Sequence, residues 1–559
     1  MKLKVSNIIK YFYIKDKATI DDFINYFGLK TKEENKKLKK ILKDLINKKL
    51  IYKENNIYLP YLFAIDKDFK NILKKIAIDP YFSNKALEEA LYIKENYIND
   101  IEEETISNKR KDLTSLFTVT MDGLNAKDFD DAISLIKEDD NYRLYVHIAD
   151  VSHYIKIGSQ LDKEAYKRGN SYYFAKCVIP MFPFYISNEV CSLNEGVKRL
   201  ALTIEILLNK NGEILENYFY KSIIKVHKRI PYEIGNEWLK DKRNKYYNFL
   251  ILCKELKEIL YKQRIENNSI DFDLPEVEME FDKSNIIPSN IYKYIRGETE
   301  RFIEEFMLVA NQSVAKYLQD KAPMIFRVHD SPPEEKREIV YKYLELLGLK
   351  KPKKYNQKEI NSILNFIRGT NEEKLLSSYI LRSMAQAFYS DKNIGHFGLN
   401  FENYTHFTSP IRRYSDLVVH RILKSIIDNT KPPYKENDLK KIAEHVSITE
   451  RNAVEAERDF LKIKGSRFLK TKKDKIFRAF VSGVTENGIF LELEEYGLEG
   501  FVPSFIIYKE NYVFDKDFLI YFKKNKKDDT IKLGDYFLVS IFSINEKRGF
   551  VDLKLIKRI

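Results

Sequence analysis

Residues 118–135 read "TVTMDGLNAKDFDDAISL", and this stretch decides how the fold is interpreted. It begins and ends with the apolar pattern of β-strands, yet four of the ten residues from 122 to 131 are aspartates: Asp122, Asp128, Asp130 and Asp131. Asp122 ends the first strand-like run, and Gly123 allows the chain to turn. Asp128 and Asp130 alternate ahead of the second run, so they share one face of an extended chain while Asp131 lies on the other.

Three explanations of this acidic stretch were compared. Acids are 83 of the 559 residues, so a solvated acidic loop is the expected explanation by count alone. A calcium loop needs glycine at its sixth position and glutamate at its twelfth, and this stretch has neither. Carboxylates gathered at the ends of apolar strands repel one another strongly when buried and unpaired. Magnesium or manganese ions would balance this charge, and two such ions ~3.5–4 Å apart form the usual device for cutting phosphodiesters.

The bulk composition favours a polyanionic partner without identifying it. Lys and Arg number 96 against 83 acids, for a net charge of +13 and a pI near 9.0. Such an excess favours nucleic acid or an anionic membrane surface, although compositional drift in a Lys-, Ile- and Asn-rich chain explains part of it. The length predicts three or four domains.

The remaining composition favours a cytoplasmic protein with reduced thiols. The three cysteines, Cys177, Cys191 and Cys253, form no CxxC pair. No apolar run reaches the ~18 residues of a membrane span. The N-terminus has lysines inside its apolar patch, which is a poor signal peptide.

Residues 1–60 are predicted to form a winged helix-turn-helix. Two capping boxes, Thr19 with Asp22 and Thr31 with Glu34, open its second and third helices, and Gly28 ends the second. The stretch "LIYKENNIYLP" predicts a hairpin. The Lys-rich third helix is suited to nucleic acid, and a protein-docking or purely structural module is the alternative.

The rest of the chain divides into three further parts. Residues 61–112 are predicted to be a helical connector. Strand and helix patterns mix from 113 to 472, the region expected to hold the acidic site. From 473 to 559 the pattern changes to five short strands separated by glycines, which is typical of a small closed barrel of the OB type. The expected fold is therefore a multidomain α+β protein.

Sequence blocks downstream of residue 113 resemble the ribonuclease II / ribonuclease R family. They occur in the family's order over residues 113–556: "TVTMDGLNAKDFDDAIS", "LYVHIADVSHYI", "RGNSYYFAKCVIPMFP", "ISNEVCSLN", "FRVHDSPP", "GHFGLNFENYTHFTSPIRRYSDLVVHRIL" and "AEHVSITERNAVEAERD". The segments "IRRY" and "HFTSP" look closer to ribonuclease R. The resemblance implies a processive 3′→5′ exoribonuclease with a ribonuclease II-type catalytic domain at 113–472 and an OB-fold RNA-binding domain at 473–559. The expected substrate is single-stranded RNA, possibly structured with a 3′ overhang, and the expected products are nucleoside 5′-monophosphates.

The resemblance also implies roles for individual residues at the reacting end of the RNA. The aspartates at 122, 128, 130 and 131 match the family's catalytic acids and are expected to hold Mg²⁺, with Mn²⁺ as the alternative. Arg412 matches the catalytic arginine, and its fixed fork of donors suits charge developing on the phosphate. The alternative for Arg412 is a structural pair with Asp416. Arg413 is assigned to substrate binding, and Glu457 falls where the family has a glutamate near the terminal nucleotide, although a helical surface acid is the alternative.

Aromatic residues are expected to contact the bases. Tyr173 matches the tyrosine that stacks on the last base, a contact worth ~1–3 kcal/mol that tolerates any base. Strand alternation allows only one of Tyr172 and Tyr173 to face the RNA. Phe326 is the expected partner across the stack, and Phe480 and Phe490 are expected stacking platforms in the barrel. For all three phenylalanines the alternative is a core position.

The sequence departs from the family in two places. The family commonly has a histidine where Pro503 stands, and it usually carries two cold-shock domains upstream of the catalytic domain, where this chain has 52 residues of connector. We expect a monomer that acts on RNA and not on membranes. An inactive RNA-binding homologue and a DNA-binding regulator led by the winged helix are the other hypotheses. Both leave the intact acidic set without a role.

Overall fold

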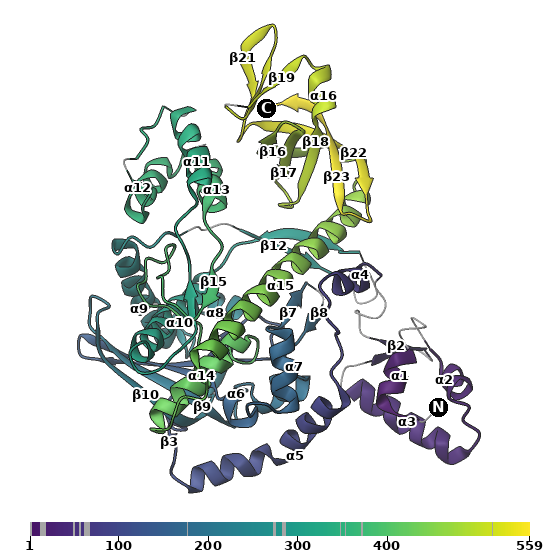
Figure 1. Ribbon diagram of the computed structural model, residues 1–559, viewed down its shortest axis with the longest axis vertical. Helices are drawn as coiled ribbons and strands as arrows, with labels where there is room; N and C mark the ends of the chain where they lie inside the picture. The colour runs from purple at the N-terminus through teal and green to yellow at the C-terminus, as the bar shows by residue number, and fades with distance from the viewer. Residues whose placement is uncertain are drawn as a thin grey trace.

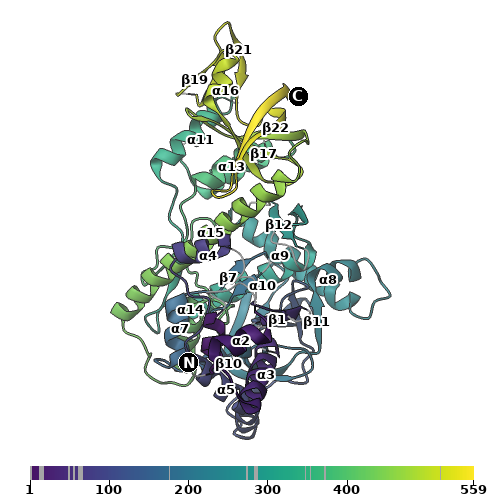
Figure 2. The ribbon, with the colours of Figure 1, turned by 90° about the vertical axis from the view of Figure 1, so that its right-hand side faces the viewer.

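Figures 1 and 2 show a computed structural model of the chain. The structure describes residues 3–11, 18–47, 51–54, 57–60, 67–175, 177–271, 275–281, 287–346, 348–352, 354–370, 373–516 and 518–559. No helix in these ranges is both long and apolar enough to cross a membrane.

The N-terminal unit consists of three helices followed by a two-stranded hairpin. The helices are α1 (Val5–Tyr11), α2 (Ile20–Phe27) and α3 (Lys32–Asn47), and β1 (Ile51–Glu54) pairs antiparallel with β2 (Ile57–Pro60). The capping predictions are confirmed: Thr19 and Asp22 exchange hydrogen bonds, and Gly28 ends α2 with a φ of 64°. The two residues of the predicted hairpin turn after Glu54 lie outside the described ranges.

Two helices connect this unit to the main body. They are α4 (Lys67–Lys75) and α5 (Asn84–Ile106), and the hydroxyl of Ser83 caps the start of α5. Helix α5 runs beside the π-helical turn η2 (Tyr185–Val190) and helix α7 (Gln160–Arg168). The described part of the predicted connector, residues 67–112, therefore contains two helices.

The acidic stretch joins two strands of a seven-stranded sheet whose order is β11-β4-β5-β6-β9-β10-β3. The strands are β3 (Lys111–Asp112), β4 (Val119–Asp122), β5 (Asp131–Glu138), β6 (Asn141–Ala149), β9 (Lys198–Leu208), β10 (Ile214–Lys225) and β11 (Lys228–Pro231). Pairs β11–β4 and β10–β3 are parallel, and the others are antiparallel. Strands β6 and β9 are buried along nearly their whole length, because protein covers both faces.

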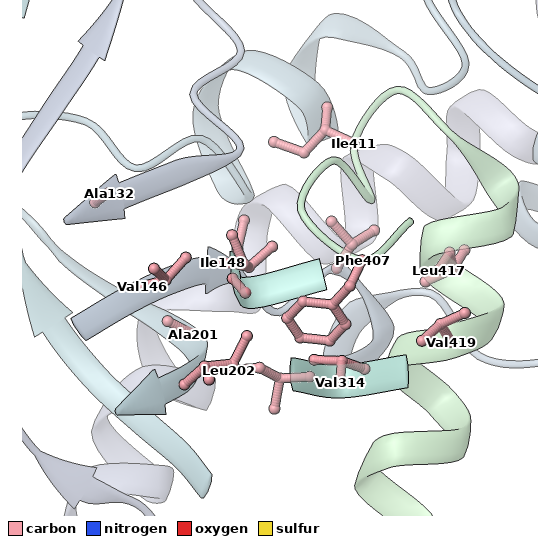
Figure 3. Packing of buried hydrophobic residues seen from close by; sticks show 14 of the residues in the cluster. Ala132, Val146, Ile148, Ala201, Leu202, Val314, Phe407, Ile411, Leu417 and Val419 are labelled. Atoms are coloured by element: carbon pink, nitrogen blue, oxygen red, sulfur yellow. The ribbon is translucent and has the colours of Figure 1, made fainter. Parts of the chain in front are cut away.

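Helices and one loop build the core on this sheet. The contributing helices are α6 (Val151–Tyr154), α8 (Tyr232–Trp238), α9 (Tyr247–Glu266), α10 (Glu298–Leu318) and α14 (Tyr414–Ile427). Figure 3 shows the fully buried ring of Phe407 between Val314 of α10, Leu417 of α14 and Ile148 of β6. Since Phe407 lies just ahead of Arg412, this packing holds the "SPIRRY" loop against the sheet.

The remaining catalytic-region elements are hairpins and helices. The hairpins pair β7 (Tyr172–Phe174) with β8 (Cys177–Ile179), β12 (Glu276–Glu280) with β13 (Asn290–Tyr294), and β14 (Phe326–Val328) with β15 (Phe388–Ser390). Helices α11 (Glu334–Leu346), α12 (Gln357–Ile367) and α13 (Glu373–Ser383) lie between β14 and β15 in sequence.

The long helix α15 (Glu436–Lys470) leads from the catalytic region to the C-terminal barrel (Figure 1). The closed barrel has the order β16-β17-β18-β23-β22. Its strands are β16 (Phe477–Thr485), β17 (Gly488–Leu493), β18 (Glu499–Pro503), β22 (Tyr536–Asn545) and β23 (Phe550–Arg558). Helix α16 (Ser504–Lys509) and a sheet of β19 (Tyr512–Asp515), β20 (Ile520–Lys523) and β21 (Lys526–Ile531) are inserted between β18 and β22. The five predicted strands are thus present.

Candidate active site

The four aspartates lie where β4 ends and β5 begins, and the "SPIRRY" loop meets them. The main chain of Asp130 is fixed because Ala149 N–H donates to its carbonyl at 2.8 Å. Its carboxylate Oδ1 accepts a hydrogen bond from Ile411 N–H at 2.7 Å. The guanidinium Nε of Arg412 lies 3.8 Å from Asp130 Oδ2. Residues 281 positions apart in sequence therefore form one site.

Burial and repulsion between carboxylates raise the pKa of Asp122, Asp130 and Asp131. Burial, with Asp128 nearby, raises the pKa of Asp122 to about 6. Burial, with Asp122 nearby, raises the pKa of Asp131 to about 7. The pKa of Asp130 is raised well above its usual range because only 4% of the residue is exposed, although Arg412 opposes this shift. Arg412, Arg229 and Arg413 oppose these shifts but do not cancel them, so the burial of the carboxylates prevails.

Two carboxylate oxygens of the site lack hydrogen bonds. Asp130 Oδ2 and Asp131 Oδ2 are buried and have no hydrogen-bond partner, whereas Asp122 Oδ1 accepts from Gly123 N–H at 2.8 Å. Buried acceptors without partners are costly, so these two oxygens are suited to binding a cation. Within the described residues, no three or more His, Cys, Asp or Glu side chains are arranged to hold a metal ion by themselves. Any ion here therefore requires water or substrate oxygens to complete its coordination.

The loop carrying the acids is braced by residues that the sequence reasoning did not single out. Arg229 of β11 donates to the carbonyls of Gly123 and Leu124 at 3.1 and 2.7 Å. Ser192 accepts from Phe129 N–H at 2.9 Å and donates to the carbonyl of Lys127 at 2.8 Å. Ser192 lies in the block "ISNEVCSLN", so the family resemblance could have identified it. No local sequence feature indicated Arg229.

The two neighbouring arginines have different environments. Arg413 pairs with Asp416 at 2.7 Å, and Asp416 is fully buried. The side chain of Arg412 is 43% exposed and faces Asp130. The structural Arg–Asp pair considered for Arg412 is thus made by Arg413 instead. The Arg413 side chain keeps 18% exposure, and its role in substrate binding stays a prediction.

Tyr173 is the aromatic residue that the structure brings to the acids. Its hydroxyl donates to Asp128 Oδ2 at 3.1 Å, and the residue is 39% exposed. Burial and the Asp128 carboxylate raise the pKa of its phenol. Tyr172 and Phe174 point to the other face of β7 and are buried. Of the two tyrosines, Tyr173 is therefore the exposed one that lies beside the acids.

The other predicted site residues lie in more ordinary surroundings. Phe326 and Phe480 are each only 7% exposed, which favours the core alternative for both. Phe490 is partly exposed, with its ring centroid 4.9 Å from that of Phe501 on the next strand. Glu457 is exposed on α15, and its charged neighbours are Glu276 and Arg458. Their RNA contacts stay predictions.

The histidines near the site are structural. His147 is fully buried between Ser134 and Thr203, with hydrogen-bonding distances of 3.2 and 2.8 Å, and burial lowers its pKa to about 3. Both ring nitrogens of His329 are engaged by main-chain groups. Both imidazoles are therefore occupied by contacts within the fold, and imidazole is not a ligand that magnesium prefers.

The part of the chain that contains this sheet and its buried acids, residues 110–429, matches the RNB domain family. The chain is 37% identical to ribonuclease R of Aquifex aeolicus over 502 residues, covering 87% of this chain and 70% of that protein. Two solved structures of Mycoplasma genitalium RNase R are similar. Its complex with ribose-methylated single-stranded RNA has a TM-score of 0.80 at 30% identity, covering 88% of this chain and 78% of that one. Its complex with double-stranded RNA has a TM-score of 0.75 at 28% identity, covering 90% and 87%. The chain belongs to the ribonuclease II / ribonuclease R family.

Proposed function

We propose that the protein is a magnesium-dependent, processive 3′→5′ exoribonuclease that hydrolyses RNA to nucleoside 5′-monophosphates. The observation that carries this proposal is the group of buried carboxylates with Arg412 beside it. This group lies in the RNB domain. The two solved structures of Mycoplasma genitalium RNase R are complexes with ribose-methylated single-stranded RNA and with double-stranded RNA. The same substrates are proposed here, with the protein acting as a monomer in the cytoplasm.

Magnesium fits the donor set of the site. Carboxylate oxygens are the ligands this ion prefers, and it is commonly bound by one or two carboxylates together with substrate phosphate and water. The unpartnered oxygens of Asp130 and Asp131 meet this requirement, and Asp122 and Asp128 complete the acidic set. When bound, the ion supplies an activated water and positive charge for the phosphate.

The residues of the chain hold and orient the RNA end. Arg412 is exposed enough to reach a phosphate, and its planar fork of donors can bind two oxygens at once. Tyr173 offers one ring face for the terminal base, held by its hydrogen bond to Asp128. Stacking of this kind accepts every base, as a degrading enzyme requires. Glu457 is assigned to the terminal nucleotide and Arg413 to the backbone behind it.

The terminal units are proposed to guide RNA into this site. The barrel connects its strands in the order one, two, three, five, four, which supports an OB-type assignment. The partly exposed rings of Phe490 and Phe501 lie on neighbouring strands and are proposed as a stacking platform. The proposed winged helix exposes Lys36, Lys39 and Lys43 on α3, a charge that suits phosphates.

Incubating the purified protein with 5′-labelled poly(A) and Mg²⁺ tests the proposal. Progressive shortening from the 3′ end with release of 5′-monophosphates is expected, and it should stop when EDTA is added. A single-stranded DNA of the same length is the matched control and should resist cleavage, because the 2′-OH distinguishes RNA from DNA. Internal cleavage, or unchanged RNA with a folded protein, would overturn the proposal.

A further inference from the structure

Helix α4 packs on the back of the hairpin that presents Tyr173. The inward side chains of that hairpin, Tyr172 and Phe174, enter a separate hydrophobic cluster with Phe69 and Ile72 of α4 and Phe460 of α15. Strand alternation places these residues directly behind the exposed tyrosine. The position of the Tyr173 ring therefore depends on what fills this cluster.

Phe69 is at the centre of the cluster. It has no exposed surface, and its ring meets that of Phe174 edge to face with centroids 4.7 Å apart. A second edge contact joins Phe69 to Phe460 at 6.0 Å, and Phe174 meets Phe460 at 5.4 Å. Three interlocked rings have few alternative arrangements, since packed aromatic groups keep specific geometries.

Charged groups hold α4 in place against α15 at both of its ends. Near the start of α4, Asp68 lies 2.6 Å from Arg467 and 3.7 Å from Lys464, which is fully buried. At the end of α4, Lys75 pairs with Glu455 at 2.6 Å and Asp459 at 2.8 Å. Figures 1 and 2 both show α4 beside α15. The helix is thus attached to the catalytic region independently of the N-terminal unit.

We propose that Phe69 is a positioning residue for RNA hydrolysis, acting through Tyr173. It fixes the β7–β8 hairpin so that the ring of Tyr173 stands ready for the 3′-terminal base. The inference rests on the proposed exoribonuclease function. According to this inference, helix α4, which lies outside the matched RNB domain, helps to shape the site that binds the end of the RNA.

A double-mutant cycle on short poly(A) tests this role. Phe69→Leu replaces the aromatic ring by a smaller side chain that is still apolar. We expect it to raise KM more than it lowers kcat. Stacking of one base is worth on the order of 5- to 150-fold in affinity, which bounds the expected rise in KM. In the Tyr173→Ala background, Phe69→Leu should have no further effect. Phe306→Leu is the matched control, because Phe306 is equally buried but belongs to the main core and not to the cluster around Phe69.

A binding measurement separates positioning from general destabilisation. An RNA ending in 2-aminopurine, bound to the hydrolysis-deficient Asp130→Asn protein, reports stacking by its fluorescence quenching. Adding Phe69→Leu to this protein should reduce the quenching at saturation, while adding Phe306→Leu should not. Lys75→Glu, which reverses a surface charge of α4 without changing the core, should reduce it in the same direction.

The outcomes are distinguishable. If the unsubstituted protein does not shorten poly(A), the proposed activity is wrong and this inference falls with it. If it does, but the effects of Phe69→Leu and Tyr173→Ala on KM multiply, Phe69 does not act through Tyr173 and only this inference is overturned. Unchanged quenching with Phe69→Leu would overturn it as well.

Discussion

Replacing Asp131 by asparagine should stabilise the protein when divalent ions are removed, although it damages the site. Asp131 Oδ2 is buried without a hydrogen-bond partner, and burial with Asp122 nearby raises the pKa of its carboxyl to about 7, against a reference of 3.8. A difference of about 3 pKa units corresponds to about 4 kcal/mol. That is the cost of keeping this carboxylate ionised in the folded protein without a counter-ion.

The pH dependence follows from the sign of this shift. The folded protein holds the proton more tightly than the unfolded chain, so the cost is absent below about pH 4, grows between pH 4 and 7, and is complete above pH 7. An asparagine leaves an amide without a partner, which costs about 1–3 kcal/mol. We expect Asp131→Asn to raise the free energy of unfolding by about 1–3 kcal/mol at pH 8 in EDTA. At pH 4 the cost of the charge is nearly absent while the unpartnered amide remains, so the variant should be less stable than the parent.

In Mg²⁺ the parent should be more stable than the Asp131→Asn variant, the reverse of the order in EDTA at pH 8. The ion binds only the folded site, so it stabilises the parent by an amount that rises with its concentration, and the variant has lost one ligand. Urea unfolding of the parent and the variant at pH 8 and pH 4, each in EDTA and in Mg²⁺, measures the free energy of unfolding of both proteins under these four conditions. Asp140→Asn, an exposed position in the turn after β5, is the matched control and should change none of these free energies. A folded Asp131→Asn protein that is less stable than the parent in EDTA at pH 8 would refute the argument that this charge is buried and uncompensated.

Three further substitutions or truncations test the site and the domain assignment. Asp130→Asn keeps an oxygen for Ile411 N–H, so it should retain RNA affinity in a gel-shift assay while hydrolysis is lost, and near-parental turnover would contradict the metal assignment. Arg412→Lys should lower kcat at least tenfold because a point charge cannot replace a bidentate fork, whereas a change confined to KM would make Arg412 a binding residue. Deleting residues 1–60 leaves α4 and its ion pairs to α15 in place, so it should weaken RNA affinity without abolishing cleavage of poly(A). A folded but inactive truncation would show that the N-terminal unit belongs to the catalytic machinery.

The sequence by itself determined the features that depend on neighbouring residues. The caps around α2 follow from local hydrogen bonding, which Thr19, Asp22 and Gly28 satisfy among themselves. The two-residue period of a strand showed that only one of Tyr172 and Tyr173 faces outward, and the family resemblance indicated that it is Tyr173. The acidic set was visible because its four members lie within ten residues, and the family resemblance supplied their roles.

Tertiary structure decided everything that depends on contacts between distant segments. Whether Arg412 or Arg413 pairs with Asp416 depends on how the "SPIRRY" loop meets the sheet, since adjacent arginines have identical local chemistry. A phenylalanine in an apolar run has the same appearance in a core and on a platform, so only packing shows that Phe326 and Phe480 are buried. The contact of Phe69 with Phe174 joins a connector to a hairpin more than a hundred residues away. No periodic pattern records such a pairing, because it is the shape of the assembled core that brings these side chains together.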